Sequence, residues 1–406
     1  MEKLLNRNYG ALHGAYWMYY GVVCSFSSVF LLSKGYSNSE IGIILAAGNI
    51  FAVLVQPFVA DLADRSKRFS VFSIMELITV LLIVLTAFLL VIEKKSFMLM
   101  FIYIMAFAWM NIVQPFCNAL SFRLQEAGVH VNFGACRSVG SLTYAVMCLF
   151  LGSLVEAKGV FVLPVTGEIV LVLFMISIIV LARSFDRAKK SHAGEAAAQG
   201  EVLQEKKKEE EINLSLFAKR HKMFLVMSCG VLGLYFANSI LNTYMAQIAA
   251  EVGGDSGDVG RIFSLLAFME IPTLVLFDRL HKRFSCKSMM KFSAVAFVIW
   301  IGICTVSVNV WMLLAAQLIQ PFSFALFLPS IVHFIDENMS KGEAVKGQMV
   351  FTATTTVAAI FASVIGGAIL DISGARVLTL TGTIVTAVGA LIIFLSVDKA
   401  GKDIEI

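Results

Sequence analysis

Polar side chains recur at helical spacing within apolar stretches of this sequence. Asn111, Gln114 and Asn118 lie at positions i, i+3 and i+7, which places them on one face of a helix. Amide groups hydrogen-bond polar organic molecules, but in hydrocarbon they are costly unless they face protein or water. Three further stripes have similar spacing: His13, Tyr16 and Tyr20; Tyr235, Asn238 and Asn242; and Gln317, Gln320 and Ser323. A hydrogen bond between helices explains any one residue, but four stripes together predict a polar cavity for a small-molecule substrate.

Arg137 is the most informative charged residue in these stretches, with Ser141 and Tyr144 on the same helical face. A guanidinium group with several donors suits a polyol, a nucleoside or a carboxylate. The alternative is an arginine that extends from a helix end to the lipid headgroups. The predicted substrate site comprises Arg137, Asn118, Gln114, Tyr144, Tyr235, Asn238, Asn242, Gln317 and Gln320.

Glu270, in the stretch "FMEIPTL", is the best candidate for a proton-coupling residue. Burial penalises the charged form of a carboxyl group and so favours proton binding, which a proton carrier requires. The alternative is a buried glutamic acid that hydrogen-bonds a neighbouring helix. Glu76 and Glu168 are weaker candidates for the same role.

The composition requires a membrane. Of 406 residues, 58% are hydrophobic and only 15% are charged, too few to coat a water-soluble domain. Apolar runs of about 20 residues, long enough to cross a bilayer as helices, recur throughout, and they are too continuous for barrel strands. The first lacks a signal-peptide cleavage site, so we expect it to be retained. Twelve spans are predicted: 11–33, 41–63, 70–92, 97–121, 133–155, 161–182, 222–247, 257–277, 287–308, 310–335, 347–370 and 375–397.

Two halves of the chain repeat each other in register. "DRSKRFS" (64–70) follows the second span and "DRLHKRFS" (278–285) the eighth, while "QPFCNAL" (114–120) lies in the fourth and "QPFSFAL" (320–326) in the tenth. These matches predict a parallel duplication of a six-helix unit, as in secondary transporters. We therefore expect an all-α membrane protein with bundles at 1–182 and 222–406, joined by a polar cytoplasmic linker at 183–221.

The repeated Asp-Arg phrase resembles the cytoplasmic loop motif of the major facilitator superfamily. That resemblance covers nearly the whole chain and implies the twelve-helix facilitator fold. Its charges are typical of interhelical ion pairs that gate the inner side, although they also fit positive-inside anchors. The predicted gating residues are Asp64, Arg65, Arg68, Asp278, Arg279 and Arg283.

Two segments, "SNSEIGIILAAGNIFAVLVQPFVADLADR" (37–65) and "NFGACRSVGSLTYA" (132–145), are similar to the oligosaccharide:proton symporter branch, whose best-known member is lactose permease. The chain also resembles nucleoside and phenylpropionate permeases. The resemblance implies that Arg137 binds sugar hydroxyls and that Tyr144 stacks on the sugar ring; Tyr235 matches a tyrosine of span seven.

Several other positions depart from the lactose permease pattern. Asn118 replaces the sugar-binding glutamate, and the charged residues of span ten are replaced by Gln317, Gln320 and Ser323. A lactose-type proton relay is therefore absent, and a disaccharide substrate is in doubt.

The sequence thus predicts a secondary transporter that moves a small polar solute, such as a sugar or nucleoside, by alternating access with proton symport. Proton-coupled efflux of drugs or sugars is the alternative. A channel fits the twofold repeat poorly, and a membrane enzyme would need a catalytic motif that the sequence lacks. We expect a monomer in contact with protons and membrane lipid, without cofactor, metal or nucleic acid. The seven cysteines are scattered, without ligand spacing, and are interpreted as small core residues.

The distribution of Lys and Arg predicts a multi-pass protein of the inner (cytoplasmic) membrane with both termini cytoplasmic, because these residues gather in alternate connections and in the linker. Cys286 is then cytoplasmic and residues 251–256 are external. A single cysteine introduced at position 255 should react with an impermeant thiol reagent in intact cells. Failure of this labelling would reverse the orientation.

Overall fold

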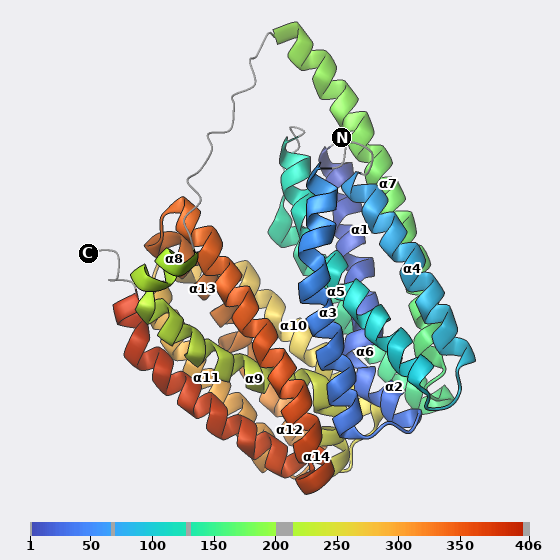
Figure 1. Ribbon diagram of the computed structural model, residues 1–406, viewed down its shortest axis with the longest axis vertical. Helices are drawn as coiled ribbons and strands as arrows, with labels where there is room; N and C mark the ends of the chain where they lie inside the picture. Colours follow the sequence, from blue (N-terminus) through green and yellow to red (C-terminus); the bar gives the residue numbers. More distant parts are fainter. Residues whose placement is uncertain (1, 66–69, 127–130, 200–213, 401–406) are drawn as a thin grey trace. The chain divides into compact units, whose positions relative to one another are not determined.

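In the computed structural model, every regular element of the described residues is a helix (Figure 1). The structure describes residues 2–65, 70–126, 131–199 and 214–400. In chain order the helices are α1 (Glu2–Tyr20), the π-helix η1 (Gly21–Ser25), α2 (Ser27–Ser33), α3 (Asn38–Arg65), α4 (Val71–Val91), α5 (Phe97–Glu126), α6 (Phe133–Lys158), α7 (Val162–Gln199), α8 (Leu214–Arg220), α9 (Lys222–Glu251), α10 (Ser256–His281), α11 (Cys286–Val306), α12 (Val310–Ala316), the 3-10 helix η2 (Gln317–Phe322), α13 (Phe324–Asn338) and α14 (Lys341–Ala400).

The fold is that of an all-α membrane protein, and its spans can be counted from the length and composition of the helices. Within the described ranges, ten helices are long and apolar enough to cross a membrane, or eleven if α1, η1 and α2 count as one span bent by 44°. The last two predicted spans both lie in α14, which is interrupted at Gly374, where φ is 79°. A positive φ is accessible to glycine and ends the regular helix. The count of twelve is therefore not confirmed.

Contacts divide the chain into two compact units, and the first comprises Met1–Tyr36 and Ala47–Lys206. Here α1 packs against α6 and α7, and α4 packs against α5 and α7. Buried tyrosines cross-link these helices: the Tyr19 hydroxyl lies 2.8 Å from Thr86 Oγ1, and Tyr103 donates to the carbonyl of Val23 at 2.8 Å. Because hydrocarbon offers no hydrogen-bond partner, each such hydroxyl must find one in the protein.

The second unit comprises Ser37–Ala46 and Lys207–Ile406 and is organised around the contact of α9 with α14. Glycines bring the two backbones together: a Cβ atom added at Gly230 would lie 2.7 Å from the carbonyl oxygen of Gly389, and one at Gly389 would lie 2.7 Å from that of Gly230. Gly233 meets the same stretch of α14. Small residues at helix interfaces allow this approach, in which van der Waals packing holds membrane helices together.

The first turn of α3 also belongs to this second unit. The carboxylate of Asp371 accepts hydrogen bonds from the backbone N–H groups of Asn38 and Ser39 at 3.1 and 2.8 Å, and from Asn38 Nδ2 at 2.9 Å. Gln247 Nε2 donates to Asn38 Oδ1 at 2.9 Å. The free N–H groups of a helix start are thereby satisfied by an acidic side chain from α14, which also complements the helix dipole.

The repeated basic phrase ends in the same structural device in both copies. Ser70 caps α4 by accepting from the N–H of Ser73 at 3.1 Å, and Ser285 caps α11 by accepting from that of Ser288 at 3.3 Å. Serine is favoured at this position because its hydroxyl satisfies one of the free N–H groups of the first turn. The final serine of each phrase is therefore the start signal of the next helix.

The glycine contact of the second unit predicts a stability difference. Gly389→Ala places a methyl group against the backbone of Gly230, and overpacking of this kind costs about 1–3 kcal/mol in the free energy of unfolding. Gly302 in α11 has no atom within 4 Å of an added Cβ, so Gly302→Ala should be neutral or stabilising by up to about 1 kcal/mol through helix propensity. Thermal unfolding of the purified variants in detergent checks this, and equal melting temperatures would contradict the packing argument.

Candidate functional site

Arg137 of the first unit is held between a hydroxyl group and an indole ring. Its Nη1 donates to Ser141 Oγ at 3.0 Å, and its guanidinium carbon lies 4.0 Å from the centroid of the Trp17 ring. Gly140 allows this arrangement, since a Cβ there would lie 2.5 Å from Trp17 Cδ1. The stacking and this hydrogen bond together orient the guanidinium plane.

Two tyrosines extend the indole into an aromatic surface. The rings of Tyr20 and Tyr144 lie 6.1 Å apart, and the Trp17 ring lies 4.9 Å from Tyr20 and 6.3 Å from Tyr144. The Tyr144 hydroxyl is 2.6 Å from Ser25 Oγ, which the π-helix η1 presents to α6. Arg137, Trp17, Tyr20 and Tyr144 are called the arginine–aromatic cluster below. It offers flat apolar faces beside fixed donors, a combination that recognises a ring bearing hydroxyl or amide groups.

The cluster contains a residue that the stripe analysis missed. Trp17 lies at i+4 from His13 and three residues before Tyr20, so helical spacing alone places it on the same face. His13 is 1% exposed, and neither of its ring nitrogens has a hydrogen-bond partner among the described residues. The face of α1 is thus more polar and more aromatic than the tyrosines alone indicate.

The amide stripe of α5 lies in partly buried surroundings. Asn111 Nδ2 donates to the carbonyl of Phe107 in its own helix at 2.9 Å. Gln114 and Asn118 are half-buried, and the Asn118 carbonyl accepts from Ser121 at 2.8 Å. The substrate role predicted for Gln114 and Asn118 stays a prediction.

Glu270 of the second unit forms a hydrogen bond with a predicted site residue. Gln320 Nε2 donates to Glu270 Oε1 at 3.1 Å, and Gln320 is 1% exposed, with its own Oε1 unpartnered in the described part of the chain. Pro321 lies in η2, where the backbone forms 3-10 rather than α-helical bonds. Proline lacks an N–H donor and interrupts the regular α-helical hydrogen bonds. The η2 segment that contains it packs against α10. The acid and the amide therefore meet at a local break in the helix.

Gln317, three residues earlier, has a different environment. Its Nε2 donates to the Leu313 carbonyl at 2.8 Å and its Oε1 accepts from Trp300 Nε1 at 3.3 Å. With 0% exposure and both ends of its amide engaged, Gln317 is better placed to stabilise α11 against η2 than to contact a solute. Its predicted substrate role remains the weakest of the set.

The stripe of α9 combines an aromatic pocket with two amides. Tyr235 lies among the rings of Phe297, Phe324, Phe327 and Phe351 at centroid distances of 5.7 to 6.4 Å. Its hydroxyl has no partner among the residues that the structure describes. Asn238 and Asn242 are half-buried and linked through Asn242 Nδ2 and the Asn238 carbonyl at 2.8 Å.

The geometry of the described residues does not test the gating prediction. Asp278, Arg279 and Arg283 are exposed at the end of α10 and in the turn after it. Arg68 and the side chains of Asp64 and Arg65 lie outside the described residues. Their role in gating stays a prediction.

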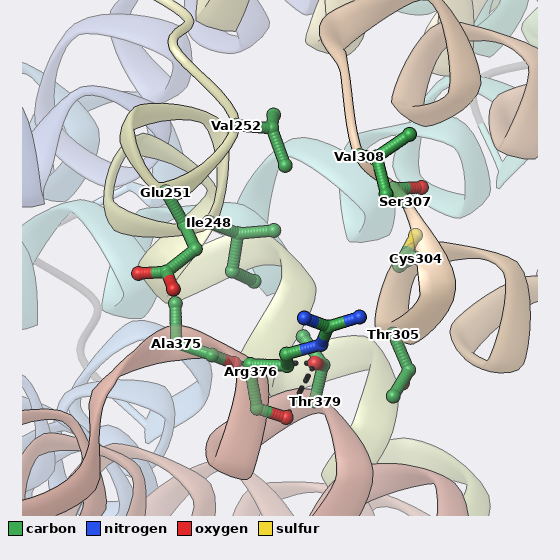
Figure 2. Close-up of a pocket in the computed structure, with 10 residues that line it drawn as sticks. All are labelled: Ile248, Glu251, Val252, Cys304, Thr305, Ser307, Val308, Ala375, Arg376 and Thr379. Carbon is green, nitrogen blue, oxygen red and sulfur yellow. Dashed lines mark hydrogen bonds between the residues drawn. The ribbon is translucent and has the colours of Figure 1, made fainter.

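A pocket of about 230 Å³ lies elsewhere in the second unit, between the ends of α9 and α11 and the part of α14 after Gly374 (Figure 2). None of the predicted site residues lines it. Figure 2 shows the guanidinium of Arg376 directed toward the side of the pocket that Cys304 and Thr305 form. No sequence pattern marks this pocket, because its residues come from three separate segments.

Comparison with known proteins gives consistent results. The profile of the MFS_1 like family matches residues 9–380. An uncharacterized transporter, YwbF of Bacillus subtilis (strain 168), is 22% identical over 344 residues, which cover 82% of this chain and 78% of that protein. Among solved structures, the nucleoside transporter NupG has a TM-score of 0.73 at 16% identity, covering 97% and 98% of the two chains. The POT family transporter PepTSo has a TM-score of 0.70 at 9% identity, covering 98% of each. At such identities the structural similarity shows the fold alone.

Proposed function

Because the chain belongs to the MFS_1 like family and is a membrane transporter of the major facilitator type rather than an enzyme, we propose that it takes up a small polar organic solute by alternating access, in symport with protons. A monomer in the cytoplasmic membrane, with both termini inside, is part of this proposal. The proposed solute is a nucleoside or a similar ring compound with hydroxyl groups. The arginine–aromatic cluster is the observation that carries it.

The chemistry of this cluster favours a hydroxylated ring over a purely apolar solute. Trp17 stacks on Arg137, and Ser141 accepts a hydrogen bond from its guanidinium group. A guanidinium has five N–H donors in a fixed plane, a geometry that suits the oxygen atoms of a hydroxylated solute. Tyr20 and Tyr144 supply the flat faces against which a base or sugar ring packs. The name of the nucleoside transporter NupG, a structural neighbour, supports the same solute class.

Glu270 is the proposed proton-coupling residue. Its carboxyl group accepts a hydrogen bond from the buried amide of Gln320. Protonation turns the carboxyl group from an acceptor into a donor, and the unpartnered Oε1 of Gln320 is the acceptor that the new donor would meet if the amide rotated. A proton can therefore change which bond the pair forms without leaving a charge in hydrocarbon.

Efflux is the second candidate function. Four phenylalanine rings surround Tyr235 in a mostly buried aromatic cluster of the second unit, and rings of this kind would suit aromatic drugs if solute entry opened the cluster. The direction of solute movement under an imposed pH gradient distinguishes the two. Protons move from the acid side of the membrane to the neutral side. Symport therefore accumulates solute on the neutral side, whereas antiport removes solute from that side.

Arg137→Gln should abolish transport or weaken it severely, and Asn118→Ala should weaken it, while both variants are expressed normally. Loss of a charged hydrogen bond to a ligand costs about 1.5–3 kcal/mol, which is roughly a tenfold to hundredfold loss of affinity. The measurement is binding of labelled sugars, nucleosides and aromatic acids to purified protein, followed by uptake of the one that binds. Arg376→Gln, which removes an arginine from the other unit, is the matched control and should bind normally. Unchanged binding and uptake in Arg137→Gln would exclude this site.

Glu270→Gln should stop accumulation driven by a pH gradient but retain solute binding and solute exchange. The amide is permanently neutral, so the solute-loaded step survives while the proton-carrying return step does not. Proteoliposomes with and without an imposed pH gradient separate these steps, and Glu156→Gln, at an exposed position of α6, is the control. If the Glu270 variant still accumulates solute against its gradient, Glu270 is only structural, and Glu76, Glu168 or another coupling ion becomes the better candidate.

A further inference from the structure

Three side chains that bind metals meet where helices of the second unit end. His281 is the last residue of α10, Cys286 is the first residue of α11, and Glu337 lies next to the end of α13. One ring nitrogen of His281, the Cys286 sulfur and one carboxylate oxygen of Glu337 all lie within 4.8 Å of one another. These atoms belong to none of the proposed solute or proton sites.

The three groups are already aligned by direct contacts. His281 Nε2 lies 3.0 Å from Glu337 Oε1, and His281 Nδ1 lies 3.5 Å from Cys286 Sγ. Two ligands on one tetrahedral zinc ion, at the usual Zn–S and Zn–N distances, are about 3.6 Å apart. The sulfur and Nδ1 are therefore already at ligand spacing. The carboxylate of Glu337 now contacts Nε2 and must turn from it to complete a three-ligand set, whose candidate atoms all lie within 4.8 Å of one another.

The surroundings fix the ligands and leave a path for an ion. Cys286 is 2% exposed and is held by the Ser285 cap, whereas the Glu337 side chain is 47% exposed and that of His281 29%. Phe277 stacks on the His281 ring with an interplanar angle of 4°. A buried sulfur, a stacked imidazole and a solvent-facing carboxylate together form a site that an ion enters from the exposed side.

The internal repeat indicates that helix packing alone does not require these groups. His281 lies in the part of the repeated phrase where the second copy has one residue more than the first. Val71 occupies the position of Cys286 in the first copy, and Val131 lies as far after Gln114 as Glu337 lies after Gln320. The first copy, with the same helix order, thus has apolar residues at two of the three ligand positions.

We propose that Cys286, His281 and Glu337 bind a divalent ion of borderline softness, with Zn²⁺ the best match, and that water completes the tetrahedron. A thiolate, an imidazole nitrogen and a carboxylate are zinc ligands, whereas the thiolate disfavours Mg²⁺ and Ca²⁺. Binding releases the proton of the Cys286 thiol to solvent and involves no change of oxidation state. Because the ligands come from α10, α11 and α13, the bound ion ties three helix ends of the second unit together.

The experiment uses the full chain, purified in detergent without a histidine tag and treated with a chelator. Titration with Zn²⁺ by calorimetry should show one equivalent bound with a dissociation constant on the order of 1 µM or tighter. Co²⁺ should produce the near-ultraviolet charge-transfer band of a cobalt–thiolate bond. Cys286→Ser should remove that band, and Cys286→Ser, His281→Asn and Glu337→Gln should each weaken Zn²⁺ binding about tenfold or more. Cys229→Ser, at the exposed cysteine of α9, is the control and should leave both signals unchanged.

Several results would overturn the proposal: no stoichiometric Zn²⁺ binding, a cobalt band that survives in Cys286→Ser, or equal affinity in Glu337→Gln. The Glu337 variant alters only an exposed side chain, so it decides the matter even if substitution of the buried cysteine prevents folding. This experiment does not depend on the proposed function, because it measures metal binding in the absence of solute and of transport.

Discussion

Hydrocarbon cannot form hydrogen bonds, and each polar atom placed within it must find a partner in the protein. The main chain meets this requirement by forming helices, and buried hydroxyls meet it by bonding to neighbouring carbonyls, as Tyr244 does with Ser363 and Tyr9 with Cys117 at 2.9 Å. Against this background, the polar atoms that lack a partner among the described residues are informative. The Tyr235 hydroxyl and the Oε1 of Gln320 belong to this small group, and both lie near Glu270.

The two units satisfy buried or partly buried polar groups by different means. In the first, a permanently charged guanidinium is stabilised on an aromatic face, which lowers the cost of its burial without neutralising it. In the second, the ionisable group is a carboxyl that an amide bonds, and a carboxyl can become neutral. A fixed charge is suited to hold a solute, whereas a group that changes its charge is suited to couple movement to protons. The repeated fold thus carries two kinds of polar centre.

Much of this organisation is readable from the sequence because it depends on local spacing. The apolar runs and the repeated charged phrase require only a count of residues, and Trp17 follows from the same count. The six-helix duplication stays a prediction. Gln317 and Gln320 show the limit of this approach. They are three residues apart and identical in type, but their hydrogen-bond partners differ: Trp300 donates to Gln317, whereas Gln320 donates to Glu270. The group of His281, Cys286 and Glu337 is invisible for a related reason. The ligands come from three helix ends, so no spacing along the chain reveals them, and the cysteines were interpreted as core residues. The last two predicted spans are not separated in α14, since a single glycine can reverse the backbone without a polar loop.

The π-helix of the first span has a consequence for how such a chain can change. A π turn is an α-helix that contains one residue more than its hydrogen bonds need, and here Phe26 N–H donates to the Gly21 carbonyl at 3.2 Å across the wider turn. Within this turn the Val23 carbonyl accepts a hydrogen bond from the Tyr103 hydroxyl, and the Ser25 hydroxyl is hydrogen-bonded to that of Tyr144. Deletion of one residue between 21 and 25 would restore a regular α-helix and leave Ser27–Ser33 close to its present orientation relative to His13, Trp17 and Tyr20, because the wider turn already absorbs the extra residue. The same deletion in a regular stretch of α-helix would rotate everything beyond it by about 100°. The first span therefore contains a length buffer, at which the chain can lose one residue without turning the face that carries the polar residues.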